Sequence, residues 1–260
     1  MNDLSIDKYL ERIGINKIDK PSLKFLSELQ LAHLYSIPFE DLDIPHRDRI
    51  ILDLERIYKK IIPTKRGGFC YELNGLFHWL LTQLGFKVDL LSARVFNHEK
   101  QKLGPEFDHL TLIVHLDKSY LTDVGFGDSF RKPIEMPEGE CKDISGYYRV
   151  YKINGTQYEL RKFEDDEWKL QYVFSTIPRD FLDYSEMCAF QQDSQTSHFR
   201  TRMKCTIATP TGRITLTDSS LTTTENGNKH KKIIETENEF HKILFDHFGI
   251  ALQSQVQLKK

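Results

Sequence analysis

The stretch KRGGFCYELNGLFHWLL, residues 65–81, decides the fold of this chain. It joins a pair of glycines to a segment whose apolar side chains recur at helical spacing. Gly67 and Gly68 allow a tight backbone just before the helix, and Cys70 stands at its first turn. Unpaired N–H groups and the positive end of the helix dipole favour a thiolate there. The stretch therefore predicts a helix that presents a reactive cysteine, with a buried structural cysteine as the alternative.

The chain before this stretch is also predicted to be helical, because its apolar residues keep the same spacing. Gly14, Pro38, Pro63 and Gly85 act as stop signals. The predicted helices cover residues 6–13, a segment opened by Pro21, a segment capped by Asp53, and the segment from Cys70 to Leu84.

From Phe86 the apolar period changes to that of short strands, separated by turn residues. A meander follows, with a turn at Asn154-Gly155. A short helix is predicted over 179–192, then a hairpin around Pro210, and finally a strand and a helix between 229 and 249. The predicted strands cover residues 87–96, 109–116, 120–126, 147–153, 156–163 and 168–174.

This order of elements predicts an α+β fold with three parts. The first is a helical N-terminal lobe over residues 1–85 that carries the cysteine. The second is a central antiparallel β-barrel over 86–190, and the third a small C-terminal α/β lid over 191–260. The arrangement resembles that of cysteine enzymes in which a helix carries the nucleophile and a barrel carries its partners.

The composition excludes several classes of function. The 260 residues carry a formal net charge of −2 and no basic run dense enough for nucleic acid or an anionic membrane. The pairs Lys59/Lys60 and Lys231/Lys232 are interpreted as solvated faces. No apolar stretch is long enough to span a membrane, and the N-terminus lacks the pattern of a secretory signal. We expect a cytoplasmic protein.

The four cysteines are Cys70, Cys141, Cys188 and Cys205. None forms a C-x-x-C pair or lies near clustered histidines, so we expect no metal site. Without an export signal, disulfides are not expected either. Each thiol is then a small buried hydrophobe or a nucleophile.

A cysteine nucleophile needs a base, and the base needs a group that orients it. His109 opens a predicted strand and is the candidate base. His115 has the same strand parity, but it lies at the far end and is expected to be exposed. Asp123 is the candidate orienting group, because a carboxylate inside an apolar strand is rarely left unpaired. Two adjacent strands would bring Asp123 beside His109.

These segments resemble the arylamine N-acetyltransferase family, in its bacterial form. RGGFC at residues 66–70, FDHLTLIV around His109 and DVGFG from Asp123 carry the resemblance. IPFEDLDI at 37–44 also matches, with Asp41 where the family usually has Asn. The segments SARV and SHF match more loosely, and the resemblance covers essentially the full length.

The resemblance implies a triad of Cys70, His109 and Asp123 and a ping-pong reaction through an acetyl-cysteine. Acetyl-CoA would be the donor, and an aromatic amine, hydrazine or N-hydroxyarylamine the acceptor, as in xenobiotic metabolism. Arg66 is usual in the family, and for Arg66 and Glu72, which flank the nucleophile, we expect a buried ion pair that orders the loop. We also expect a monomer or homodimer. The matching positions would place Phe39, Phe69 and Phe126 in the wall of an acceptor pocket, with plain core packing as the alternative, and Val95, Gly127 and Phe199 near the coenzyme.

Two other functions stay open on the sequence. A papain-like or transglutaminase-like hydrolase would use the same three residue types to cleave amides. A binding module could keep the fold without catalysis. Release of coenzyme A in a burst would favour the transferase, and an unreactive Cys70 would favour the binding module.

Overall fold

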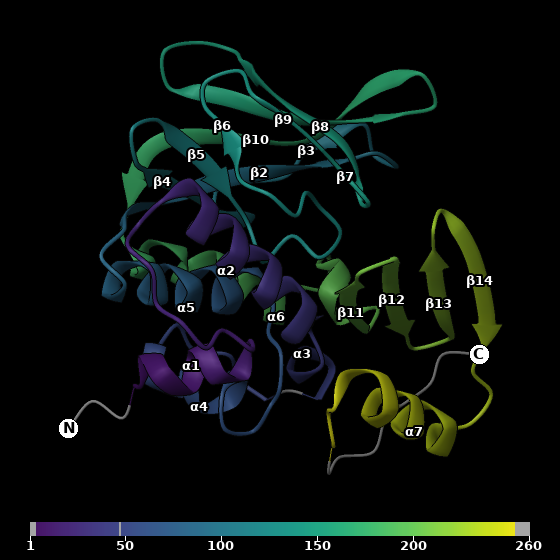
Figure 1. Cartoon of the computed structure of the whole chain (residues 1–260). Helices are drawn as coiled ribbons and strands as arrows, with labels where there is room; N and C mark the ends of the chain where they lie inside the picture. The colour runs from purple at the N-terminus through teal and green to yellow at the C-terminus, as the bar shows by residue number, and fades with distance from the viewer. Residues whose placement is uncertain (1–3, 47, 253–260) are drawn as a thin grey trace.

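The computed structural model describes residues 4–46 and 48–252. Helices of the N-terminal part gather below the large sheet, with α5 directly against it (Figure 1). Ser22, rather than Pro21, caps α2: its hydroxyl accepts the Phe25 N–H at 3.2 Å. The predicted cap at Asp53 is confirmed. The helices are α1 (Ile6–Arg12), α2 (Leu23–Ser36), α3 (Asp43–His46), α4 (Leu54–Ile61) and α5 (Cys70–Gln83).

The large antiparallel sheet curls into a nearly closed barrel. Its hydrogen-bonded order is β6-β5-β4-β2-β10-β9-β8-β7, with β3 paired to β2. The two edge strands, β6 and β7, lie near one another. Its strands are β2 (Lys87–Asn97), β3 (Lys102–Leu103), β4 (His109–His115), β5 (Ser119–Thr122), β6 (Ile134–Glu135), β7 (Glu140–Asp143), β8 (Gly146–Lys152), β9 (Gln157–Glu164) and β10 (Glu167–Arg179).

The five-stranded sheet of the C-terminal part borrows a strand from the N-terminal part. β1 (Phe39–Glu40) pairs with β11, so Phe39 lies opposite Thr206. The predicted hairpin and final helix are confirmed. These elements are β11 (Lys204–Thr209), β12 (Gly212–Thr217), β13 (Ser220–Glu225), β14 (Asn228–Ile233) and α7 (Glu237–Phe248).

Two short helical elements connect the sheets: η1 (Phe181–Tyr184) with α6 (Ser185–Asp193), and then η2 (His198–Arg200). The predicted boundary at 190/191 therefore falls inside α6. The short α3, β3, β6 and β7 were not predicted, because segments of two to four residues give no readable period. The predicted strand over 120–126 is too long, since β5 ends at Thr122.

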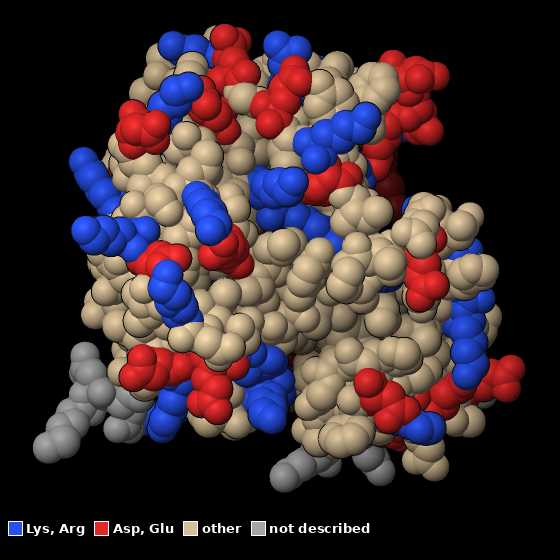
Figure 2. Space-filling view, viewed as in Figure 1, with Lys and Arg blue, Asp and Glu red and all other residues tan. Residues whose placement is uncertain are grey.

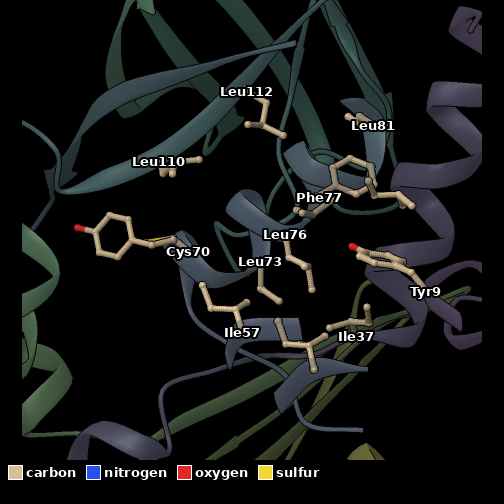
Figure 3. Close-up of a cluster of buried hydrophobic side chains, with 14 of the residues drawn as sticks. Tyr9, Ile37, Ile57, Cys70, Leu73, Leu76, Phe77, Leu81, Leu110 and Leu112 are labelled. Carbon is tan, nitrogen blue, oxygen red and sulfur yellow. The ribbon is translucent and has the colours of Figure 1, made fainter. Parts of the chain in front are cut away.

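The largest of the apolar clusters joins the N-terminal helices to the side chains that β2, β4 and β5 turn towards them, whereas a separate cluster fills the interior of the barrel. In Figure 3, Leu73, Leu76 and Phe77 of α5 lie among side chains from α1, α4 and β4. Cys70 lies at the start of this helix, close to Leu110. The nucleophile candidate is thus fixed to the most heavily packed part of the molecule.

The exposed face mixes acidic and basic side chains, as expected for a net charge of −2 (Figure 2). In the same view the surface is hollowed between the barrel and the C-terminal sheet with α7. Among the described residues, no helix is both long and apolar enough to cross a membrane. Within those same ranges, no group of His, Cys, Asp and Glu side chains is arranged to hold a metal ion.

Candidate active site

Cys70 is the first residue of α5, as predicted, and its side chain is almost completely buried at 5% exposure. The loop before it runs beside the segment at Phe39, where the Glu40 N–H donates to the Gly68 carbonyl at 2.9 Å. A Cβ at Gly67 would stand 2.1 Å from the Pro38 carbonyl oxygen. The glycine pair is therefore required by close backbone approach.

Below this loop lies a buried cluster of charged side chains. Lys60 Nζ contacts both carboxylate oxygens of Glu72 at 2.9 Å and Asp43 at 2.7 Å. Arg66 contacts Glu40 at 2.8 Å and Asp43 at 2.5 Å. Arg66 and Glu72 thus each form buried ion pairs, but they do not pair with each other. The interpretation of Lys60 as solvated is wrong, because the three carboxylates surround it.

Glu72 links this cluster to the start of the catalytic helix. Its Oε2 accepts the Phe69 N–H at 3.1 Å, which satisfies one of the unpaired donors at the helix N-terminus. Its carbon and oxygen atoms lie within 2.8 to 3.2 Å of where a Cβ at Gly68 would stand. The cluster therefore fixes the loop that places Cys70.

His109 and Asp123 meet as predicted. His109 is the first residue of β4, Asp123 follows β5, and β4 pairs with β5. The His109 Nε2 and Asp123 Oδ2 atoms lie 2.7 Å apart, and both side chains are buried. Because Nε2 is engaged with Asp123, Nδ1 is the imidazole nitrogen left to exchange a proton with another group. Contrary to expectation, Asp123 sits in a turn rather than inside a strand.

Three further groups hold the Asp123 carboxylate. Asn74 Nδ2 donates to Oδ1 at 2.9 Å, and the Gly125 N–H donates to the same oxygen at 2.8 Å. The Tyr172 hydroxyl donates to Oδ2 at 3.2 Å. Burial by itself favours the neutral acid, but His109 and these hydrogen bonds hold the pKa of Asp123 below its ordinary value.

The turn after Asp123 also lies directly over the helix start. A Cβ at Gly125 would stand 2.9 Å from both Cα and the carbonyl oxygen of Cys70. Asn74 Nδ2 donates to the Leu110 carbonyl at 2.6 Å, which joins the start of β4 to α5. The three candidate residues are thereby held against one turn of helix.

The thiol of Cys70 differs from the sequence prediction. Burial raises its pKa well above the ordinary value, while hydrogen bonding from the Leu110 backbone lowers it by less. Asp108 and Asp123 raise it further, because negative charges disfavour a thiolate. Burial and the nearby carboxylates thus oppose the low pKa expected from the helix dipole, and a thiol in these surroundings needs a base.

His115 lies at the far end of β4, as expected, but it is only half-exposed. Its Nε2 lies 2.9 Å from an Asp89 oxygen and its Nδ1 lies 2.9 Å from the Ser119 hydroxyl. These partners engage both nitrogens of His115, so His109 stays the candidate base.

The three predicted aromatic residues differ in exposure. Phe126 is half-buried, and its ring lies 5.1 Å from the rings of His109 and Tyr172. Phe69 is completely buried, with its ring 5.9 Å from that of Phe199. Phe39 is 9% exposed. The Lys204 ammonium lies over the Phe39 ring, 6.0 Å from the ring centroid. Phe126 is the one that offers an accessible ring.

The positions expected near the coenzyme lie in three different elements. Val95 is half-buried on β2, opposite Tyr172. Gly127 is buried with φ of +87°, a conformation that favours glycine. Phe199, on η2, is half-buried.

Comparison with known proteins decides the family. A family model described as N-acetyltransferase matches residues 22–257. The chain belongs to the arylamine N-acetyltransferase family. It is therefore an acyltransferase, and the hydrolase alternative falls away.

Several members of the arylamine N-acetyltransferase family are similar over nearly their whole length. Arylamine N-acetyltransferase 2 of Mus musculus is 31% identical, with 97% of this chain and 96% of that protein covered. The solved arylamine N-acetyltransferase of Bacillus cereus, described as having a unique Cys-His-Glu catalytic triad, matches with a TM-score of 0.89 and 28% identity, covering 97% of this chain and 100% of that one. The Mycobacterium marinum enzyme in complex with CoA matches with a TM-score of 0.86 and 30% identity, covering 95% of this chain and 93% of that one.

Sequence reasoning missed the residues that connect the candidate triad. Asn74 follows Cys70 by one helical turn, which was a readable signal for a polar residue facing the site. Tyr172 and Gln30 gave no signal, because they come from distant segments. Gln30 Nε2 donates to the Asp123 backbone carbonyl at 3.4 Å.

Proposed function

We propose that this enzyme transfers an acetyl group from acetyl-CoA to an aromatic amine, hydrazine or N-hydroxyarylamine through an acetyl-Cys70 intermediate. The observation that carries the proposal is the 2.7 Å contact between His109 Nε2 and Asp123 Oδ2, held against the first turn of the Cys70 helix. The CoA complex of the Mycobacterium marinum relative supports the choice of donor.

In the first half-reaction, Nδ1 of His109 takes the proton of the Cys70 thiol. The sulfur attacks the thioester carbonyl, and backbone N–H groups at the start of α5 stabilise the oxyanion. The bond to the coenzyme sulfur then breaks, and the imidazolium returns the proton to that sulfur as coenzyme A leaves. Asp123 stabilises the imidazolium and fixes which nitrogen carries the proton.

In the second half-reaction, the amine nitrogen attacks the carbonyl of acetyl-Cys70. His109 takes a proton from the amine as the new C–N bond forms, and the Cys70 sulfur leaves and recovers that proton. Because burial raises the pKa of the Cys70 thiol, little thiolate forms without His109 in the first half-reaction, and in the second the departing sulfur needs the proton that His109 returns.

The aromatic side chains suit the acceptor. We assign Phe126 to the wall that contacts the aryl ring, since it is half-buried beside His109. Phe69 would support this wall from behind, and Phe39 would border it. Val95, Gly127 and Phe199 are proposed to lie along the path of the coenzyme. A wall of this kind also limits water, which would hydrolyse the acetyl-enzyme.

A rapid-mixing experiment with acetyl-CoA and no acceptor tests this proposal. We expect a burst of coenzyme A equal to the enzyme concentration, followed by slow release, with no burst from Cys70→Ala. Cys188→Ala is the matched control, because Cys188 is also a buried free thiol and should keep the burst. Steady release with no burst would overturn the acetyl-enzyme.

A further inference from the structure

Lys204 places a positive charge at the edge of the candidate active site. Its half-buried side chain reaches from the start of β11, and Nζ lies 3.8 Å from where a Cβ at Gly127 would stand. Gly127 directly follows Phe126, whose ring contacts His109. The ammonium group therefore lies beside the residue that follows Phe126, whose ring is proposed to contact the acceptor.

Among residues 4–46 and 48–252, no carboxylate forms a salt bridge with this ammonium, and Asp128 and Asp41 act on it only from a longer distance. It lies over the face of the Phe39 ring, 6.0 Å from the ring centroid. The carboxylate of Asp128 is taken by Arg213, whose Nε lies 3.0 Å from Oδ1. Asp41 accepts the backbone N–H of Lys204 at 2.7 Å, so this carboxyl is engaged with the main chain, and burial raises its pKa well above the ordinary value.

Arg213 adds a second cation behind the first. Its Nη1 donates to the Thr206 hydroxyl at 3.1 Å. The methyl carbon Cγ2 of Thr206 lies 3.7 Å from the position that a Cβ at Gly127 would take. Partial burial and then the charge of Arg213 lower the pKa of Lys204, while Asp128 and Asp41 raise it by less. An excess of positive charge in a partly buried site attracts an anion.

We propose that Lys204, supported by Arg213, binds an anionic group of a substrate of the acetyl transfer. Two sources share this chemistry: a carboxylate on the ring of the acceptor, and a phosphate of the coenzyme. Both form charge-assisted hydrogen bonds with an ammonium group. The inference rests on the proposed function, since it assumes that both substrates reach Cys70.

Two selectivity ratios test the inference and separate the sources. The first compares kcat/KM for 4-aminobenzoate with that for aniline, both with p-nitrophenyl acetate as a donor without phosphate. The second compares acetyl-CoA with p-nitrophenyl acetate, both with aniline. In Lys204→Met, which keeps the apolar stem, we expect one ratio to fall about tenfold, as for loss of one charge-assisted hydrogen bond.

A fall in the first ratio assigns the subsite to the acceptor, and a fall in the second assigns it to the coenzyme. Lys204→Arg should restore most of the lost ratio, and Lys204→Gln repeats the comparison if the Met variant does not fold. Lys231→Met, on exposed β14, is the matched control and should leave both ratios unchanged.

Unchanged ratios in Lys204→Met and Lys204→Gln would overturn the inference. Mass spectrometry of the wild-type enzyme after acetyl-CoA treatment separates this failure from failure of the proposed function. If wild-type Cys70 is acetylated while both ratios stay unchanged, only the anion subsite is wrong.

Discussion

Asn74 joins α5, the helix that begins with Cys70, to the turn at Asp123: its Nδ2 lies 2.9 Å from Asp123 Oδ1, and its Oδ1 accepts the Val124 N–H at 2.9 Å. Asn74 stands one helical turn after Cys70, so both side chains leave the same face of α5. Asn74 therefore ties the position of Asp123 directly to that of Cys70.

Replacing Asn74 with alanine should slow acetylation of Cys70 about a hundredfold, because a misplacement of about 1 Å in reacting groups has an effect of that size. Coenzyme A release in single-turnover kinetics measures it. Gln83→Ala, at the exposed end of the same helix, is the control and should react at the wild-type rate. A normal rate in the Asn74 variant would show that Asp123 holds its place without it.

Asp123→Asn should fold but react about a thousandfold more slowly or worse, because an amide does not stabilise the imidazolium or fix the tautomer of His109. Circular dichroism checks the fold, and the burst of coenzyme A checks the chemistry. Activity close to wild type would mean that another group orients His109.

Gly125→Ala should damage the site through the backbone. The new Cβ would stand 2.9 Å from Cα of Cys70 and 2.7 Å from Asn74 Nδ2, so the turn must move away from the helix. We expect at least about a tenfold loss in the acetylation rate, in line with the sensitivity of catalysis to position. Gly155→Ala is the matched control, since nothing lies within 4 Å of its Cβ. Equal rates in the two variants would contradict the close packing of the turn.

Glu72 should make stability depend on pH. Burial raises the pKa of Glu72 from 4.5 to about 7, despite its contact with Lys60. The folded state then holds this proton more tightly than the unfolded chain. The stabilisation that the protonated carboxyl gives is therefore present below pH 4.5 and is lost as the pH rises to about 7. The change is about 3 kcal/mol at most.

Urea unfolding between pH 5 and pH 7.5 measures this dependence. Glu72→Gln should flatten the slope of unfolding free energy against pH, because the amide does not titrate. Glu55→Gln, at an exposed position of α4, should keep the wild-type slope. The same slope in both variants would show that Glu72 does not titrate in this range.

Local patterns in the sequence predict much of this molecule. Helical spacing and Gly or Pro stops located four helices of the N-terminal part, and short runs rich in β-branched residues, bounded by turn residues, located the main strands. The contact of His109 with Asp123 was predictable because their segments are neighbours in the chain and pair as adjacent strands.

What the sequence could not reveal depends on distant contacts and burial. Lys60 resembles a solvated lysine until α3, β1 and α5 bring three carboxylates around it. The pairing of Phe39 with Thr206 joins segments far apart in the chain. The pKa of the Cys70 thiol followed burial rather than the helix dipole, and burial is a property of the packed structure.

Acetylation of Cys70 is the most direct test of the central claim. The enzyme is incubated with acetyl-CoA, digested and analysed by mass spectrometry. The account predicts one acetyl group per chain, on the peptide that contains Cys70, and its removal when an aromatic amine is added. An unmodified Cys70 in enzyme that transfers acetyl groups, or an acetyl group on a different residue, would contradict it.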